Sequence, residues 1–518
     1  GHASTALSAA LGIAHARDIK GEKFAVCAVI GDGSFSGGMV YEALNNAARL
    51  KTNLICILND NDMAISKPVG GMAKYITQIR TSNVYTSAKQ KFEGVFDRIP
   101  KIGVPLKKKI EKTVDRLRDL VVEVREGVIF EEFGFRYLGP INGHNIPLLM
   151  GALKYAKNYD KPVMIHVITK KGKGHLPAER NPIYYHGISP KNSNKVQTEK
   201  RPTFTEIFGD EIVQIALKNE NVVVVTPAMA EGSGLQNYAN TFPKRFFDVG
   251  IAEEHAVTFC AGLAANGLKP VLAIYSTFLQ RGFDQVIHDV CLQNLPVVFA
   301  LDRAGLVGED GPTHHGVFDL SYLLLIPNLV ILAPKDEASL RQMLQWSIKQ
   351  EVPVAIRYPR GEVCSSDLPN KELEAYKAEV MLDFEKHSEK DKKILLIAVG
   401  NMSMPAYNAA QKLQEEKGLD CAAIDLGFVK PFDKDLVKKY AGLADHVLLV
   451  EEGSAIGGVF FYVLRELMQE NIDINKWQQI AVPDEFIEHG CSSILREKYG
   501  LCEEGIIKRV RNLLENSK

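Results

Sequence analysis

The most informative pattern in this chain is a pair of polar turns at residues 31–33 (GDG) and 59–61 (NDN), each following an apolar run. Each turn therefore lies where a buried strand is predicted to end, and ligands of parallel sheets bind at such carboxyl ends. Asp32 offers a carboxylate oxygen and Asn61 an amide oxygen, ligands that suit Mg²⁺ together with phosphate oxygens. Gly33 lets the backbone approach a phosphate closely. The pattern predicts a magnesium–diphosphate site.

The same turns resemble the hallmark of thiamine diphosphate enzymes, in which GDG is followed, after a few tens of residues, by an ending of the NN or NDN type. A GDG alone is an ordinary strand-to-turn signal, but strand, GDG, helix, strand and NDN in one βαβ unit is far rarer. The resemblance implies that Asp32 and Asn61 bind Mg²⁺ and that the backbone carbonyl of Met63 completes the ligands. It also assigns Gly33, Ser34 and Asn61 to cofactor binding.

Length and composition favour a large globular protein without a nucleic-acid or membrane partner. The chain has 518 residues, enough for several domains, and its formal net charge is −1. No apolar run approaches the ~20 residues of a membrane helix, and no secretory signal opens the chain. The eight cysteines are scattered without a CxxC pair, which favours a reducing compartment. We predict a cytoplasmic protein.

Apolar runs alternate with amphipathic stretches, which indicates βαβ units and an α/β fold with mainly parallel sheets. Two polar, turn-rich stretches interrupt this alternation and are typical of linkers. We predict three α/β domains at residues 1–187, 203–365 and 393–518, joined by linkers at 188–202 and 366–392.

A second functional candidate lies in the string FFDVGIAEEHAVTF, where Glu253 and Glu254 open a predicted helix. The helix dipole favours a glutamate at this position, so the residue alone needs no function. Beside the GDG and NDN turns, however, the segment resembles the string IAEQHA of thiamine diphosphate enzymes, with Glu254 in place of glutamine. The resemblance implies that Glu253 contacts the aminopyrimidine ring of the cofactor, whose thiazolium carbanion attacks a carbonyl.

Longer strings narrow the resemblance to the 1-deoxy-D-xylulose-5-phosphate synthase family. They are TPAMAEGSGL, IYSTFLQRGFDQVIHDV, LDRAGLVGEDGPTHHGVFDLSYL, RYPRGE and FVKPFD. The resemblance implies a transketolase-like fold, with a diphosphate- and magnesium-binding domain, a pyrimidine-binding domain and a transketolase C-terminal-like domain, in a homodimer. It implies a transferase that condenses pyruvate, with decarboxylation, and glyceraldehyde 3-phosphate to 1-deoxy-D-xylulose 5-phosphate, a precursor for isoprenoids, thiamine and pyridoxal.

Two arginines suit these anionic substrates. Arg303 and Arg360 each end a predicted strand, and the guanidinium fork matches a phosphate well. A single arginine is more often part of a surface ion pair, but two at strand ends favour a shared anion. The resemblance assigns both, with Tyr275 and Arg281, to substrate binding.

Asp310 and His314 are four positions apart on a loop that contains glycine and proline. A carboxylate can hold an imidazole in one tautomer for proton transfer. The same spacing also caps turns, and His315 is a rival for the role. The resemblance selects Asp310 and His314 as catalytic. It also assigns roles to isolated residues, which are His186 in catalysis and Gly1, His2, Ala3 and His175 in cofactor binding.

Several features depart from the family pattern. His175 stands where the family commonly has tyrosine, and Asn142 where an aspartate is usual. The chain opens on GHAST, without the leading segment and the phosphate-contacting histidine of the family. We therefore expect residues 1–518 alone to fold but to catalyse poorly, with apolar surface exposed near Leu7 and Leu11.

Other functions remain open at this point. Another thiamine diphosphate enzyme, such as a transketolase or a component of a 2-oxoacid dehydrogenase, has a similar layout. A non-catalytic, truncated relative would keep the fold without needing to bind the cofactor and Mg²⁺. A P-loop nucleotide-binding protein is disfavoured because the sequence has no GxxxxGK[ST] motif.

Overall fold

The computed structural model describes residues 1–48, 52–61, 69–81, 127–182, 184–186, 201–364, 368–385, 392–468 and 472–516. These residues form two compact units. The first comprises residues 2–194 and 249–252, and the second comprises Gly1 with residues 195–248 and 253–518. Met63 and most of the predicted linker at 188–202 lie outside the described residues.

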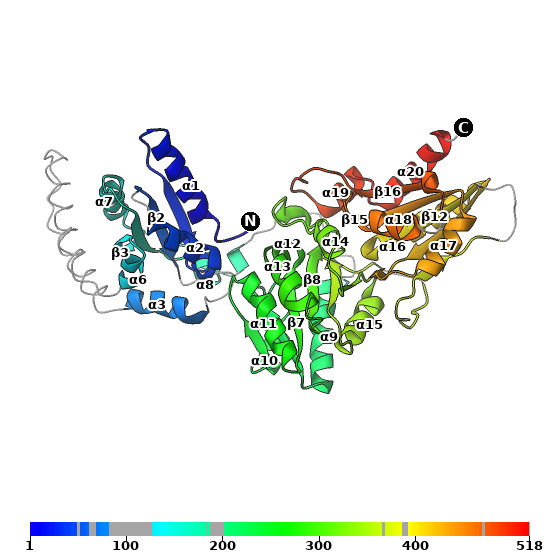
Figure 1. Ribbon diagram of the computed structural model, residues 1–518, viewed down its shortest axis with the longest axis horizontal. Coiled ribbons are helices and arrows are strands. Elements are labelled where there is room, and N and C mark those ends of the chain that lie inside the picture. The colour runs from blue at the N-terminus through cyan, green and yellow to red at the C-terminus, as the bar shows by residue number, and fades with distance from the viewer. Residues whose placement is uncertain are drawn as a thin grey trace. The chain divides into compact units, whose positions relative to one another are not determined.

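The first unit contains a β-sheet with helices beside it (Figure 1). The sheet has four strands, is fully parallel and has the order β1-β2-β4-β3. The strands are β1 (Cys27–Gly31), β2 (Ile55–Asp60), β3 (Arg136–Asn142) and β4 (Val163–Ile168). The helices are α1 (Ala6–Ile19), α2 (Gly38–Ala47), α3 (Gly70–Thr81), α6 (Val128–Glu132), α7 (Ile146–Lys157) and α8 (Leu176–Arg180). β2 and β4 lie in the middle of the sheet and are almost fully buried, which explains their continuous apolar sequences.

Leu7 and Leu11, near which we expected exposed apolar surface, are themselves buried. Leu7 is fully buried and Leu11 is 6% exposed, and both belong to the core that α1 forms with α2 and the sheet. Their spacing, with Ala10 and Ala14, places them on one face of α1, which packs inward. The exposed apolar side chains of this region are instead Ile13 and Ile19 on α1 and Val29 on β1.

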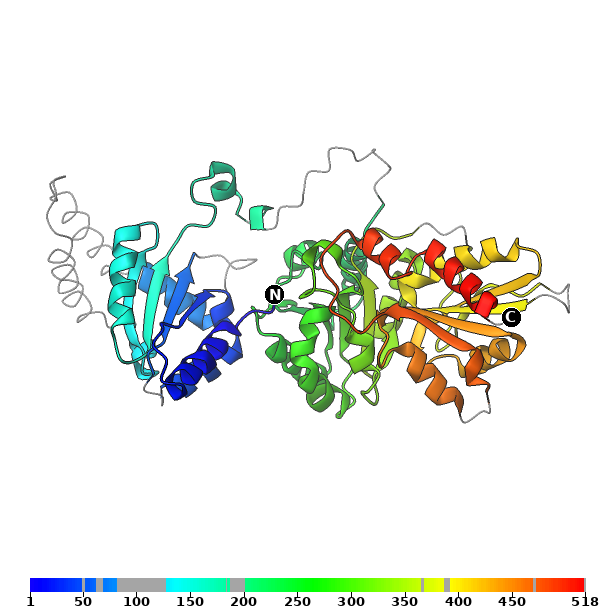
Figure 2. The same cartoon turned by 90° about the horizontal axis from the view of Figure 1, so that it is seen from above.

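The second unit contains two sheets, each with helices beside it (Figure 2). The seven-stranded sheet has the order β14-β9-β10-β8-β7-β5-β6 and the five-stranded sheet the order β11-β13-β12-β15-β16. All pairings are parallel except β14 with β9 and β11 with β13. The predicted α/β fold with mainly parallel sheets is therefore confirmed.

Strands and helices alternate along most of this unit. The strands are β5 (Val222–Thr226), β6 (Phe246–Asp248), β7 (Lys269–Tyr275), β8 (Val298–Ala304), β9 (Val330–Leu332), β10 (Val354–Pro359), β11 (Glu379–Leu382), β12 (Lys392–Ala398), β13 (Leu419–Asp425), β14 (Phe428–Lys430), β15 (His446–Ser454) and β16 (Trp477–Val482). The helices are α9 (Phe204–Lys218), α10 (Gln236–Thr241), α11 (Glu253–Ala265), α12 (Ser276–Leu279), α13 (Phe283–Gln285), α14 (Asp319–Leu323), α15 (Glu337–Ile348), α16 (Ser403–Gln414), α17 (Lys434–Leu443), α18 (Val459–Met468), α19 (Ser492–Lys498) and α20 (Glu503–Asn516).

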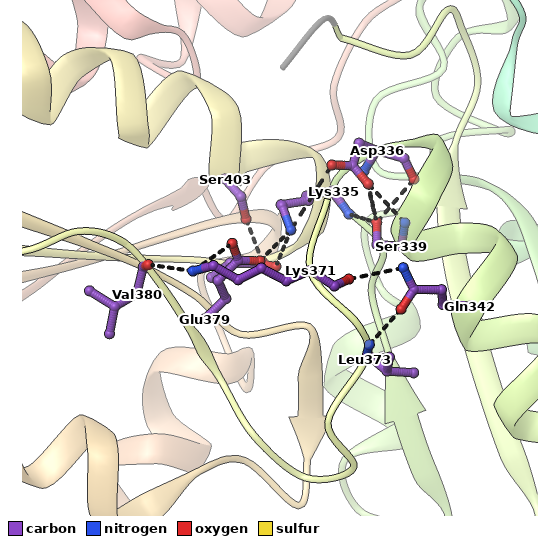
Figure 3. A network of polar contacts seen from close by, with 10 residues as sticks. Lys335, Asp336, Ser339, Gln342, Lys371, Leu373, Glu379, Val380 and Ser403 are labelled. Atoms are coloured by element: carbon purple, nitrogen blue, oxygen red, sulfur yellow. Dashed lines mark hydrogen bonds and ion pairs between the residues drawn. The ribbon is translucent and has the colours of Figure 1, made fainter. Parts of the chain in front are cut away.

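The two sheets of this unit are closely connected. β14 belongs by sequence to the predicted third domain, yet it pairs with β9 and extends the seven-stranded sheet. A polar network also joins the start of α15 to the five-stranded sheet (Figure 3). In it, Lys335 Nζ lies 2.6 Å from Glu379 Oε2 and 3.9 Å from Asp425 Oδ2. Burial raises the pKa of Asp425 to about 7, and the Lys335 ammonium opposes that rise. The predicted domain bounds stay a prediction.

Candidate active site

The carboxyl ends of β1 and β2 lie side by side, and each carries a predicted metal ligand. Gly31 is paired with Asn59 in the parallel register, so Asp32 and Asn61 leave the sheet at the same edge. Asp32 is 7% exposed, and its N–H donates to Asn59 O at 3.2 Å. Its Oδ1 accepts the N–H of Gly33 at 2.9 Å, which fixes the carboxylate over the turn. The structure thus places the predicted pair at one edge, where metal binding stays a prediction.

The predicted cofactor segments at residues 2–3 and 33–34 are brought together through Ser4. The Ser4 hydroxyl donates to the carbonyl of Ser34 at 2.7 Å, and Ser4 is 5% exposed. Its φ of 71° is unusual for a residue other than glycine. A Cβ on Gly37 would overlap the Ser4 side chain, so this close approach requires glycine. The GHAST string therefore packs directly against the GDGS turn.

Lys171 is a nearby cation that the sequence analysis did not select. It follows β4, the neighbour of β2 in the sheet. Partial burial lowers the pKa of Lys171, and the negative charge of Asp32 opposes that fall. Thr169 ties the ends of these strands together by donating to Asn59 Oδ1 at 2.7 Å. The signal was available in the sequence, because the lysine-rich string TKKGKG follows an apolar run.

Both departures from the family pattern lie in the first unit. Asn142 ends β3, and its Oδ1 accepts the N–H of His144 at 3.0 Å, so it retains a hydrogen-bonding role. His175 precedes α8 and packs edge-on against Tyr185, with ring centres 5.5 Å apart. His186 lies in the turn Tyr184–His186, and its side chain is outside the described part of the chain.

The donor set at this edge suits Mg²⁺ better than a transition metal. Within the described ranges, no group of three or more His, Cys, Asp or Glu residues could hold a metal ion. One carboxylate and one amide are oxygen ligands for a hard cation that shares its coordination shell with phosphate oxygens, and the nearby lysine complements the phosphate charge. The residues present therefore fit a magnesium diphosphate group.

In the second unit, Glu253 begins α11 and is 2% exposed. Arg281 Nη1 lies 3.1 Å from Glu253 Oε2. Burial raises the pKa of Glu253, and the Arg281 guanidinium opposes that rise. The adjacent Glu254 is only half-buried, so the structure distinguishes the two glutamates. The sequence analysis placed Arg281 among the substrate ligands and did not foresee its contact with Glu253.

Three of the predicted substrate residues meet at the carboxyl ends of β7, β8 and β10. Tyr275 is paired with Asp302 across β7 and β8, and β10 is the other neighbour of β8. The Nη1 atoms of Arg303 and Arg360 lie 2.9 Å and 2.8 Å from Asp310 Oδ2. Arg303 also lies over the Tyr275 ring, 3.9 Å from its centre. The two arginines therefore converge on one point, as their strand-end positions suggested.

The backbone and the hydroxyl groups around this cluster are constrained. Arg303 has a φ of 61°, a strained conformation that is typical of functional sites. Burial raises the pKa of Tyr275 to about 12, although the Arg303 charge opposes that rise. The phenol is therefore protonated at neutral pH. A Cβ on Gly232 would overlap the Tyr275 hydroxyl, so the tyrosine is packed closely against the backbone.

Asp302 and Tyr358 lie beside this cluster, and the sequence analysis missed both. Asp302 is fully buried, its Oδ2 accepts the Thr205 hydroxyl at 2.8 Å, and burial raises its pKa to about 6. Within the described ranges, Asp302 Oδ1 and the buried Tyr358 hydroxyl have no hydrogen-bond partner. The string LDR, with an aspartate before the strand-end arginine, was the available signal.

The two candidate histidines both lie on the loop after β8, but they have different contacts. His315 is 4% exposed, and both ring nitrogens contact backbone groups, Nδ1 the N–H of Val307 at 3.2 Å and Nε2 the carbonyl of Glu488 at 3.1 Å. His314 Nδ1 lies 2.9 Å from the Thr313 hydroxyl, a residue that Gly1 also approaches. His315 is therefore engaged structurally, which favours His314 for proton transfer. The pairing of Asp310 with His314 stays a prediction.

Comparisons with known proteins cover nearly the whole chain. Residues 1–169 match the family described as 1-deoxy-D-xylulose-5-phosphate synthase. Residues 200–365 match the transketolase pyrimidine binding domain, and residues 384–506 match the transketolase C-terminal domain. Among solved structures, a chain titled "Split gene transketolase, inactive beta4 tetramer" aligns with a TM-score of 0.54 at 27% identity, covering 60% of this chain and 97% of that one.

Curated relatives agree with these matches. The 1-deoxy-D-xylulose-5-phosphate synthase of Desulforudis audaxviator (strain MP104C) is 47% identical over 512 residues, which cover 98% of this chain and 79% of that protein. The synthase of Clostridium kluyveri (strain NBRC 12016) is 46% identical over 521 residues, covering 100% of this chain and 81% of that protein. The fold is transketolase-like, and the chain belongs to the 1-deoxy-D-xylulose-5-phosphate synthase family.

Proposed function

We propose that this chain condenses pyruvate and glyceraldehyde 3-phosphate, with release of CO₂, to 1-deoxy-D-xylulose 5-phosphate, using thiamine diphosphate and Mg²⁺. The observation that carries this proposal is the 47% identity with a curated synthase over 98% of the chain. The site geometry supports it, because a sheet edge with oxygen ligands suited to Mg²⁺, a buried glutamate and a pair of arginines are the parts that such a reaction needs.

The first unit supplies the residues that would hold the cofactor. Asp32 and Asn61 would bind Mg²⁺ together with the backbone carbonyl of Met63, and Gly33 and Ser34 would cradle the diphosphate. Lys171 adds a positive charge beside Asp32. The remaining predicted cofactor residues of this unit are His2, Ala3 and His175, whereas Gly1 and Glu253 belong to the second unit. When bound, thiamine diphosphate supplies the carbanion that attacks pyruvate and the electron sink for decarboxylation.

Glu253 would exchange a proton with the aminopyrimidine ring. Its Oε2 is engaged by Arg281 at 3.1 Å, so we assign the proton exchange to Oε1. Burial holds the pKa of this carboxyl above its usual range, so Glu253 holds a proton more readily than an exposed glutamate does.

The arginine cluster would bind the acceptor phosphate. Arg303 and Arg360 present two guanidinium groups that Asp310 holds together, and bidentate groups of this kind match a phosphate well. Tyr275 offers a neutral hydroxyl as a hydrogen-bond donor. We assign proton transfer at the reacting carbonyl to His314 and His186.

The assembly and the location of the protein are further parts of this proposal. We propose a homodimer in the cytoplasm, with domains at residues 1–187, 203–365 and 393–518. The family matches at 1–169, 200–365 and 384–506 support this division. Among the described helices, none is long and apolar enough to cross a membrane.

The proposed function predicts a specific dependence between the two substrates. With thiamine diphosphate and Mg²⁺, the protein should release CO₂ from pyruvate only when glyceraldehyde 3-phosphate is present, and mass spectrometry should detect 1-deoxy-D-xylulose 5-phosphate. Two-carbon transfer between sugar phosphates without pyruvate would instead identify a transketolase. Failure to bind thiamine diphosphate would identify a non-catalytic relative.

Replacement of Glu253 tests its role in proton exchange. Glu253→Gln should still bind the cofactor but exchange the thiazolium proton for deuterium roughly 100-fold more slowly, because an amide cannot take up and return the proton. NMR after an acid quench measures this rate. Glu254→Gln is the matched control and should exchange as the wild type does. The reverse result, with only the Glu254 variant slow, would reassign the role.

Replacement of Arg360 tests the acceptor-phosphate site. A lost charged hydrogen bond costs about 1.5–3 kcal/mol, so Arg360→Ala should raise the KM for glyceraldehyde 3-phosphate roughly 10–100-fold and the KM for pyruvate far less. Arg341→Ala serves as the control, because Arg341 pairs with Glu211 and Glu337 away from the cluster. An equal rise in both KM values would refute the assignment.

A further inference from the structure

Residues 305–316 form a closed loop that carries both Asp310 and His314. Gly305 and Gly316 exchange two backbone hydrogen bonds of 2.8 Å at its base. Gly311 lies near the tip with a φ of 75°. The base is thus fixed by the loop itself, whereas the tip needs support from elsewhere.

Part of that support comes from the five-stranded-sheet domain. The loop lies within the match to the pyrimidine binding domain, whereas this supporting domain lies within the match to the transketolase C-terminal domain. The N–H of Gly490 donates to the carbonyl of Gly308 at 3.2 Å. A Cβ on Gly311 would lie 3.1 Å from the Cβ of His489. Residues 488–490, which precede α19, therefore contact the loop at its centre and near its tip.

A buried ion pair of the same domain supports the base of the loop. Glu452 is fully buried, and its Oε1 lies 2.6 Å from Arg496 Nε. A Cβ on Gly305 would overlap the Glu452 carboxylate, so the carboxylate rests directly against the loop base. The N–H of Ser454 also donates to the carbonyl of Val317 at 2.8 Å. The domain thus contacts the base as well as the tip.

His315 connects the loop to residues 488–490. Because the N–H of Val307 is a donor, the Nδ1 that it contacts must accept, and the ring proton therefore resides on Nε2. Nε2–H then donates to the Glu488 carbonyl at 3.1 Å. One buried imidazole therefore holds the start of the loop on one side and the five-stranded-sheet domain on the other.

We propose that His315 is a positioning residue that fixes Asp310 and His314 for catalysis by tying their loop to residue 488. Its Nε2–H bond to the Glu488 carbonyl is the part of the contact that reaches the other domain. The five-stranded-sheet domain thereby takes part in the chemistry although it carries none of the proposed catalytic groups. This inference rests on the proposed function, and errors of about 1 Å in such placement cost about 100-fold in rate.

Two substitutions separate the two hydrogen bonds of His315. His315→Gln can keep a donor at the position of Nε2, toward the Glu488 carbonyl. His315→Asn can keep only an acceptor at the position of Nδ1, toward the Val307 N–H. We expect His315→Asn to lower kcat on the order of 10–100-fold with little change in the KM for pyruvate, and His315→Gln to retain most of the kcat. His288→Ala, at an exposed histidine, should behave as the wild type.

The outcome that overturns the proposal is an equal kcat for the Asn and Gln variants, or losses that simply follow the melting temperature of each. If the histidine variants fail to fold, Gly490 gives an independent test from the other side. Gly490→Pro removes the N–H that donates to Gly308, whereas Gly490→Ala keeps it. Only the proline variant should lose kcat, and wild-type kcat in both would refute the proposal.

These results are distinguishable from a failure of the proposed function. A wild-type protein that forms no 1-deoxy-D-xylulose 5-phosphate contradicts the proposed function itself. Normal product formation by the wild type, combined with an unchanged kcat in His315→Asn, contradicts only the positioning role.

Discussion

The parallel pairing of strands is the constraint on which the rest of the structure depends. It sends the residues that follow neighbouring strands to the same edge of a sheet. In one unit this edge carries Asp32 and Asn61 after β1 and β2. In the other it carries Tyr275 and Arg303 at the ends of β7 and β8. Side chains from distant parts of the sequence thereby come to lie at the same sheet edge, although no short sequence motif contains them all.

Buried charge then gives each edge its chemical character. Glu253 and Arg281 form an almost buried pair, and the burial of the glutamate raises its pKa. Asp310 forms ion pairs with both Arg303 and Arg360. Its carboxylate therefore offsets the repulsion between the two guanidinium groups. The burial of Glu253 requires a partner for its charge, whereas the partly exposed arginine cluster is ordered by its ion pairs with Asp310.

The sequence predicted those site residues that follow strands, because strand ends can be inferred from apolar runs. It did not predict contacts that depend on tertiary packing, such as Arg281 with Glu253 or His315 with the carbonyl of Glu488. The sequence places β14 in the predicted third domain, at residues 393–518. Its pairing with β9 in the seven-stranded sheet is a contact between residues far apart in the sequence, which the sequence pattern does not reveal. The burial of Leu7 was not predicted because the sequence pattern defines the apolar face of α1 but does not show what covers it.

The central claim is that the shared edge of β1 and β2 binds a magnesium–diphosphate group through Asp32. Calorimetric titration of thiamine diphosphate, with and without Mg²⁺, tests it most directly. The account predicts Mg²⁺-dependent binding that Asp32→Ala weakens roughly 10–100-fold or more, with the melting temperature retained and with Asp160→Ala, an exposed site in the same unit, unchanged. An Asp32→Ala variant that binds thiamine diphosphate with wild-type affinity and Mg²⁺ dependence would contradict the account.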